Sequence, residues 1–97
     1  MVRYLVLLKF TDQGIRNVAD SIDRATAFRK AARDKGAEVE AHFWTLGAYD
    51  GVFILRAPDE ATAAGLVLGL GHTASVSTNM LRAFDEAEFE EVLGHAT

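Results

Sequence analysis

Hydrophobic residues follow two different spacings along this chain, and the change of spacing separates strands from helices. Val2–Phe10 is a nearly continuous apolar run, which is typical of a central strand covered on both faces. Spacings of three and four residues follow and predict a helix from about Ile22, with Ser21 as its N-cap and Gly36 as its stop. This apolar stripe consists of Ile15, Val18, Ile22, Ala25, Phe28 and Ala32.

A spacing of two residues returns at Ala37–Leu46 and predicts a second strand. Simple alternation assigns its side chains to two faces: Val39, Ala41, Phe43 and Thr45 on one, and Glu38, Glu40, His42, Trp44 and Leu46 on the other. The glycine-containing segment Gly47–Gly51 then leads directly into another apolar run, Gly51–Leu55. The two strands are therefore expected to form a hairpin.

The second half of the chain repeats the order of helix and strand. Pro58 ends the third strand, and Asp59 is expected to cap a helix over Ala61–Leu70 that stops at Gly71. Ser75–Phe84 is expected to be the last strand.

A short acidic helix is expected after the last strand. Asp85 and Glu88 have the spacing of a capping box, and Phe89, Val92 and Leu93 form an apolar stripe.

The resulting order predicts an α+β fold of the ferredoxin-like type, βαββαβ, over one domain that spans residues 1–97. Its sheet has four antiparallel strands, and right-handed crossovers place both helices on one face. Alternation assigns His42, Trp44 and Leu46 to the other, bare face. A soluble monomer seldom exposes so much apolar surface. We therefore expect a second copy to cover it, as two sheets packed face to face in a dimeric α/β barrel.

Composition excludes several classes of partner. The net charge is −4 and the basic residues are scattered, which argues against a nucleic-acid-binding surface. The chain has no cysteine, so disulfides and thiolate metal sites are absent, and this fits a cytoplasmic protein. No apolar stretch approaches the ~20 residues of a membrane span. A soluble, cytoplasmic homo-oligomer without a membrane partner is expected.

His42 and Trp44 are the first candidate site residues. In a functional interpretation the indole stacks on a flat ligand and the imidazole moves a proton. In the alternative, Trp44 anchors an interface and His42 is a half-exposed strand residue.

Tyr49 and Asp50 form the second candidate pair. Asp followed by Gly is ordinary turn chemistry, in which the carboxylate accepts local amide hydrogen bonds. The functional alternative makes Asp50 an acid or base at the mouth of the barrel.

Lys9, Asn79 and Arg82 can add polar contacts to a ligand pocket, and Arg82 suits an anionic ligand. Each can equally be a strand residue with its head group in water. The connection Thr11–Gly14 can act as a gating loop, although its residue types suit any connection.

Metal and cofactor sites are not expected. His42, His72 and His95 are far apart and lack the spacing of a helical zinc site. The sequence contains no serine nucleophile elbow, phosphate-binding loop or dinucleotide fingerprint.

The segment Trp44–Asp50, continuing through Ala57–Asp59, resembles the signature of the GYD-domain family, named after a Gly-Tyr-Asp element. Ala48 lies between Gly47 and Tyr49-Asp50, so the match is a G-x-YD pattern. The resemblance extends to Lys9–Gly14 and Leu81–Phe84. It implies a small bacterial or archaeal protein with a dimeric α/β-barrel fold and no assigned reaction. Arg56 departs from the pattern, where an acidic residue is expected.

Three functions compete at this level. The first is a homo-oligomeric binding module that holds a small apolar or aromatic ligand against Trp44, between sheet faces. The second is a cofactor-independent enzyme, resembling monooxygenases or isomerases of this fold, in which His42 or Asp50 moves a proton. The third is an assembly protein whose open face serves only oligomerisation.

Overall fold

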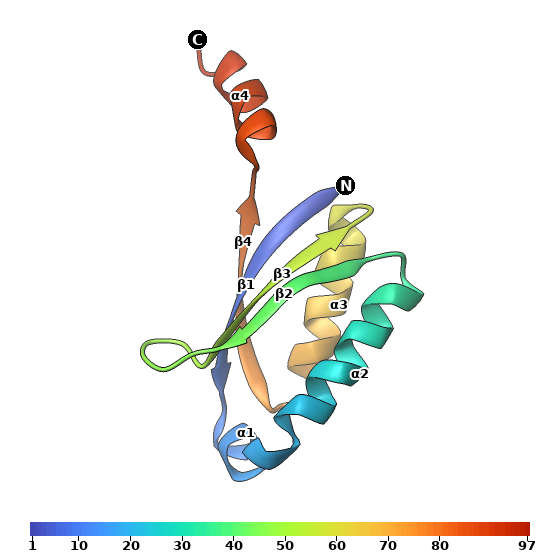
Figure 1. Cartoon of the computed structure of the whole chain (residues 1–97), viewed down its shortest axis with the longest axis vertical. Coiled ribbons are helices and arrows are strands. Elements are labelled where there is room, and N and C mark those ends of the chain that lie inside the picture. Colours follow the sequence, from blue (N-terminus) through green and yellow to red (C-terminus); the bar gives the residue numbers. More distant parts are fainter.

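The computed structural model describes residues 1–97, in which four strands and their helices follow one another as the hydrophobic spacing predicts (Figure 1). The elements are β1 (Val2–Phe10), α1 (Asp12–Arg16), a 3-10 turn (Val18–Asp20), α2 (Ser21–Asp34), β2 (Glu38–Trp44), β3 (Gly51–Ala57), α3 (Glu60–His72), β4 (Val76–Ala83) and α4 (Glu86–Gly94). All the predicted strands and main helices are present, with bounds shifted by a few residues.

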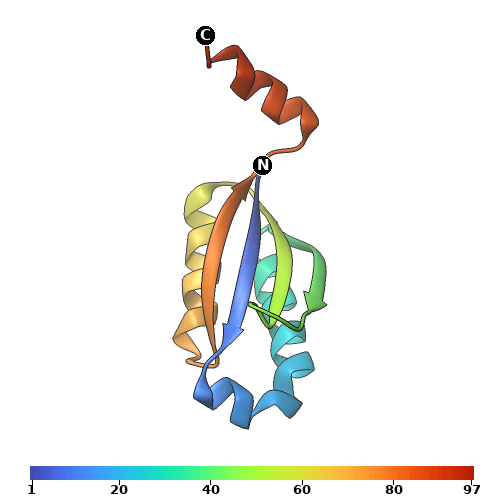
Figure 2. The same ribbon diagram turned by 90° about the vertical axis from the view of Figure 1, so that its left-hand side faces the viewer.

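The strands form one antiparallel sheet in the order β2-β3-β1-β4, which confirms the ferredoxin-like prediction. Both long helices, α2 and α3, cover the same face of the sheet (Figures 1 and 2). Nothing covers the opposite face, and we call it the open face. β1 is central, as predicted, but only one of its faces is covered.

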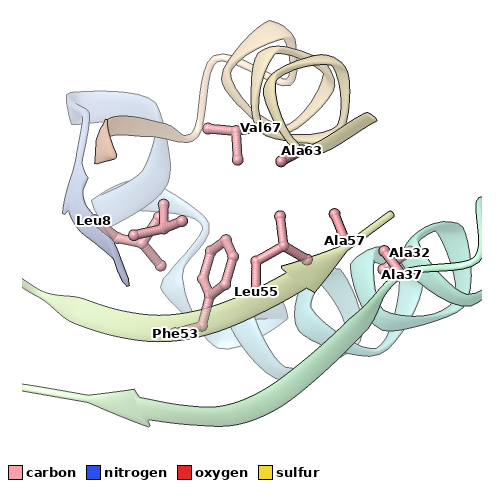
Figure 3. Packing of buried hydrophobic residues seen from close by; sticks show 9 residues of the cluster. Leu8, Ala32, Ala37, Phe53, Leu55, Ala57, Ala63 and Val67 are labelled. Atoms are coloured by element: carbon pink, nitrogen blue, oxygen red, sulfur yellow. The ribbon is translucent and has the colours of Figure 1, made fainter. Parts of the chain in front are cut away.

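The hydrophobic core lies between the sheet and the two long helices (Figure 3). Val6 and Leu55 are fully buried at its centre, and Phe53 packs against Phe28 of α2 with ring centroids 5.0 Å apart. The small residues Ala32 and Ala63 bring α2 and α3 close to the strands, and both are fully buried. The core is therefore small, with 13 of the 97 residues buried.

The connection after β1 differs from its prediction as a loop. Thr11 caps the short helix α1, because its hydroxyl accepts a hydrogen bond from the Gly14 amide at 3.1 Å. Ser21 is the first residue of α2 and makes no capping bond, so the prediction of Ser21 as an N-cap was wrong. The 3-10 turn Val18–Asp20 leads directly into α2, so Asp20 occupies the N-cap position.

The other predicted helix ends are confirmed. Gly36 has a φ of 75° just after α2, in the left-handed region that favours glycine. The Asp59 carboxylate accepts from the Thr62 amide at 2.7 Å and begins α3, which runs one residue past Gly71. Asp85 and Glu88 form the complete capping box of α4.

Helix α4 projects beyond the end of the sheet instead of packing on it (Figures 1 and 2). The longest dimension of the molecule is 49 Å and its radius of gyration is 14.4 Å. A compact chain of this length has a radius of gyration of about 12.5 Å. The apolar stripe of α4 is therefore left without a partner inside the chain: Phe89, Val92 and Leu93 are all exposed.

Candidate functional site

A β-bulge in β2 decides which residues reach each face of the sheet. The pairing of β2 with β3 shifts register between Val39 and Ala41, so one extra residue interrupts the alternation. His42 consequently lies opposite the buried Phe53, on the helix-covered side. The assignment of His42, Trp44 and Leu46 to the open face was wrong: His42 and Trp44 face the helices, and Leu46 lies beyond the strand.

The same shift sends Ala41 and Phe43 to the open face, opposite Ile54 and Val52 of β3. The sequence had predicted these two side chains to face the helices. Phe43 is 62% exposed there, so the strand carries apolar residues on both of its sides.

His42 and Trp44 form a stacked aromatic pair. Their ring centroids are 4.3 Å apart with an interplanar angle of 19°, and the His42 ring also meets Phe53 edge-on at 5.8 Å. Partial burial lowers the pKa of His42 below its usual 6.5, and the positive charge of Arg29 lowers it further. The imidazole is therefore mostly neutral near pH 7.

The space beside this pair is small. A pocket of about 50 Å³ opens between the sheet and α2, where His42 and Trp44 meet Phe28, Leu70 and Ser75. Binding sites for drug-sized molecules usually enclose about 300 Å³ or more. One face of the Trp44 ring is already covered by His42, so the predicted stacking of a flat ligand would have to use the other face.

The segment Thr45–Asp50 ties the β2–β3 connection to the end of β1. The Asp50 carboxylate accepts a hydrogen bond from the Phe10 amide at 2.8 Å, and the Asp50 amide donates to the Leu8 carbonyl, also at 2.8 Å. Within the connection, the Thr45 hydroxyl donates to the Tyr49 carbonyl at 2.6 Å. The carboxylate thus bonds across the fold, whereas the turn prediction had it accept local amides.

Tyr49 and Asn79, two of the residues predicted to contact a ligand, lie next to each other. The Asn79 amide group donates to the Tyr49 hydroxyl at 3.3 Å, across 30 residues of sequence. Asn79 pairs with Leu7 in the sheet and Lys9 pairs with Ser77, so both lie on the open face near the same end of β1. Lys9 is exposed there.

Arg82 lies near the opposite end of the sheet, away from these groups. Its guanidinium carbon stands 4.5 Å from the Phe84 ring centre and 5.8 Å from that of Tyr4, and it donates to the Arg3 carbonyl. It also approaches Glu88 of α4 at 3.9 Å. Arg82 therefore holds the base of α4 and does not belong to the pocket beside His42.

Two apolar rows cross the open face; the sequence predicted an apolar surface here but not the residues that form these rows. The strand register aligns Ala41, Ile54, Leu5 and Leu81 in one row, and Phe43, Val52 and Leu7 in the next, which ends at Asn79. The continuous apolar run of β1 was the signal that could have found them. It indicates apolar side chains on both faces, and only one face has helices.

Charged side chains border these rows at the end of the sheet near the N-terminus. Arg3 donates to both carboxylate oxygens of Glu40, at 2.6 and 3.3 Å. This hydrogen bond lowers the pKa of Glu40 below its usual value, and the charges of Arg3 and Arg56 act in the same direction. Arg3 also approaches Glu88 at 3.6 Å and Asp85 at 3.9 Å. Charges of both signs are therefore paired at this margin.

Comparison with known families confirms the family that the G-x-YD pattern indicated. The family model described as GYD domain matches residues 4–93, nearly the whole chain. The chain belongs to the GYD-domain family. The match also includes most of α4, which lies beyond the residues that carried the resemblance.

Two proteins of Thermus thermophilus are similar to this GYD domain. One is named glutamine synthetase and cystathionine beta-lyase binding protein; it is 34% identical over 89 residues, which cover 91% of this chain and 94% of the relative. The other is seen in the crystal structure of TTHA0845, which superposes with a TM-score of 0.55 over 88% of this chain and 95% of that chain. At 23% sequence identity, this second likeness supports the fold alone.

The residues of this GYD domain do not gather into a metal centre: no three His, Asp or Glu side chains lie together as ligands would. No helix has the length and apolar character needed to cross a bilayer. Arg56, which departs from the expected pattern, faces the open side between Glu38 and Arg3 in the strand register. Its charge lowers the pKa of Glu40, so it forms part of the charged margin.

Proposed function

We propose that this GYD domain is a protein-binding module that works as a homodimer through its open face. The observation that carries this proposal is the pair of apolar rows on the open face, of which one crosses all four strands and the other crosses three and ends at Asn79. Phe43 is 62% exposed and Leu81 is 48% exposed in these rows. Contiguous apolar surface of this kind usually marks an interaction site.

A second copy is the occupant that suits this face. A two-fold dimer presents the same patch on both subunits, so the patch must be complementary to itself. Apolar rows meet this requirement, and sheets pack face to face readily about 10 Å apart. The charged margin is also compatible with a second copy. Its two positive residues, Arg3 and Arg56, are balanced by the negative Glu38 and Glu40, so two such margins would not repel each other.

Binding to other proteins is the second part of the proposal. The relative with 34% identity is named as a binding protein for glutamine synthetase and cystathionine beta-lyase. By analogy, we infer that the homodimer binds a metabolic enzyme and is not itself a catalyst. The small volume of the pocket beside His42 agrees with this inference.

A small ligand between the paired faces is a second candidate, favoured by the polar group at the end of the rows. Tyr49 and Asn79 are hydrogen-bonded there, and Lys9 is exposed nearby. Trp44 faces the helices, so its fluorescence is a poor probe of such a ligand. The side-chain amide resonances of Asn79, followed during addition of aromatic acids, would report binding directly.

An enzyme is the third candidate, with His42 and Asp50 as its proton-transfer groups. The neutral imidazole of His42 beside a pocket favours it. The Asp50 carboxylate, in contrast, is already engaged by the Phe10 amide. If the protein turns over a substrate and the rate is unchanged in His42→Gln and Asp50→Asn, the two residues do not act as proton-transfer groups.

Sedimentation equilibrium with Phe43→Lys tests the homodimer. The wild type should dimerise, and the new charge should weaken association by about tenfold or more, because it would be buried in an apolar interface. Leu68→Lys is a matched control, since Leu68 is 74% exposed on α3, away from the open face. This control should dimerise as the wild type does.

Calorimetric titration with purified glutamine synthetase from the same organism tests the partner. Binding by wild type and Leu68→Lys is expected, and loss of binding by Phe43→Lys would link it to the dimer. A wild-type chain that is monomeric at all concentrations and does not bind the enzyme would refute the proposal.

A further inference from the structure

A groove between α2 and α3 offers a second apolar surface, on the outer side of the helix layer. Its volume is about 720 Å³, in contrast to the small pocket beside His42. Small residues keep it open along both helices, among them Ala27, Ala31 and Gly65. A Cβ atom added at Gly65 or Gly69 would meet no atom within 4 Å, so the space above these glycines is empty.

The groove has charge of one sign only. Arg24 and Lys35 are its only charged lining residues, and both are cationic. They are 11 residues apart along α2 and its C-terminal cap, about 16 Å at the rise of a helix. An apolar channel with cations towards both ends fits an amphipathic helix that carries carboxylates beside its apolar stripe.

Helix α4 is such a helix. Phe89, Val92 and Leu93 are 49%, 39% and 54% exposed, so the whole stripe lacks a partner in its own chain. The helix contains four glutamates and no basic residue. Its 9 residues extend about 14 Å, within the length of about 20 Å that the 13 residues of α3 provide.

The base of α4 is held where the helix points away from its own groove. Arg3 approaches Glu88 at 3.6 Å and Asp85 at 3.9 Å, and only Phe84 and Asp85 separate the helix from β4. Both views show α4 beyond the end of the sheet, whereas α2 and α3 lie along one face of it, to the right in Figure 1 and behind in Figure 2.

We propose that α4 of one copy docks into the α2–α3 groove of a second copy, with its flanking carboxylates towards Arg24 and Lys35. This contact uses a different surface from the proposed sheet-face dimer. In such a dimer the grooves remain on the outside, so α4 would link dimers into larger assemblies.

Charge reversal in the full-length chain tests this pairing by sedimentation velocity. At about 100° per residue, Glu90 flanks the apolar stripe, whereas Glu91 lies about 200° from Phe89, on the opposite side of the helix. Glu90→Lys and Lys35→Glu should each weaken the larger assembly by about tenfold. Glu91→Lys and Arg33→Glu carry the same charge changes outside the contact and should behave as wild type.

An equimolar mixture of Glu90→Lys and Lys35→Glu gives the decisive result. The lysine introduced by Glu90→Lys should pair with the glutamate introduced by Lys35→Glu, while the unaltered helix and the unaltered groove also remain able to pair. Assembly should therefore return on mixing. If mixing restores nothing, the pairing of α4 with the groove is wrong.

Gly65→Leu provides an independent variant that should fold normally. The added side chain enters the empty groove and should block the larger assembly while the circular dichroism spectrum stays that of the folded wild type. If Phe43→Lys alone dissociates the dimers, and Gly65→Leu and Glu90→Lys assemble as the wild type does, this inference is overturned. The sheet-face proposal would then still stand. An assembly lost in Glu90→Lys but retained in Phe43→Lys would support the α4 contact and overturn the sheet-face proposal.

Discussion

The carboxylate of Asp50 accepts a hydrogen bond from the backbone amide of Phe10 at 2.8 Å, although 40 residues separate them. The amide of Asp50 returns a bond to the Leu8 carbonyl. This exchange fixes the G-x-YD segment of the family against the end of the central strand. It gives the aspartate a structural role that needs no catalytic chemistry.

Replacing Asp50 should therefore lower the free energy of unfolding. In Asp50→Ala the partly buried Phe10 amide loses its acceptor, which should cost about 1–3 kcal/mol. Asp50→Asn keeps an oxygen that can accept the bond and should lose less. Urea unfolding followed by Trp44 fluorescence measures both variants. Equal stability of Asp50→Ala and wild type would contradict the structural role.

Gly14 should tolerate no larger side chain. A Cβ at this position would overlap the Ser75 carbonyl oxygen, a backbone atom that also accepts from the Thr11 amide. Gly14→Ala should lower the free energy of unfolding by about 1–3 kcal/mol through overpacking. Gly65→Ala is the matched control and should raise it by about 0.5–1 kcal/mol, because alanine loses less conformational entropy than glycine in an open helical position. Urea unfolding compares the two variants, and a Gly14→Ala chain as stable as wild type would contradict the close approach.

The lowered pKa of His42 should make stability depend on pH in a defined direction. The unfolded chain binds the proton more readily than the folded chain, so folding is favoured most above about pH 6.5. That contribution is lost as the pH falls from 6.5 through the lowered folded pKa. Urea unfolding at several pH values should show a smaller loss on acidification in His42→Gln than in wild type. An NMR titration midpoint of His42 above 6.5 would refute this assignment.

Glu40 should show a pH dependence in a more acidic range. Its pKa is lowered by the hydrogen bond from Arg3, so its contribution is present above the usual pKa of 4.5 and is lost as the pH falls through the folded value. Glu40→Gln should melt below wild type near neutral pH, and the difference should close in strong acid. A constant difference across this range would show that the carboxylate charge is unimportant.

Hydrophobic spacing predicted the order of strands and helices, because every element has the apolar period of its own geometry. The caps at Gly36, Asp59 and Asp85 were also predictable, since each depends on residues within one helical turn. Thr11 is a comparable local signal three residues before Gly14, but the residue types of Thr11–Gly14 suit a loop as well as the start of a short helix.

The faces of β2 could not be predicted, since a bulge leaves no mark in the alternation itself. One extra residue at Glu40 exchanges the two faces for every later position. Hydrophobicity did not reveal the exchange, because Phe43 is apolar although it faces the open side. The bond from Asp50 to Phe10 and the pair of Tyr49 with Asn79 depend on chain folding over 40 and 30 residues, beyond the reach of any local pattern.

The small core makes the stability of the folded chain depend on the concentration of the protein. Only 13 of 97 residues are buried by the chain itself, while the open face and α4 keep large apolar side chains exposed. Under the proposed contacts, mass action ties the folded state to the number of copies present. The melting temperature should then rise with protein concentration. Chains present at low copy number would stay unpaired and would be the first to unfold and be degraded, so the cellular level should fall steeply when synthesis is slow.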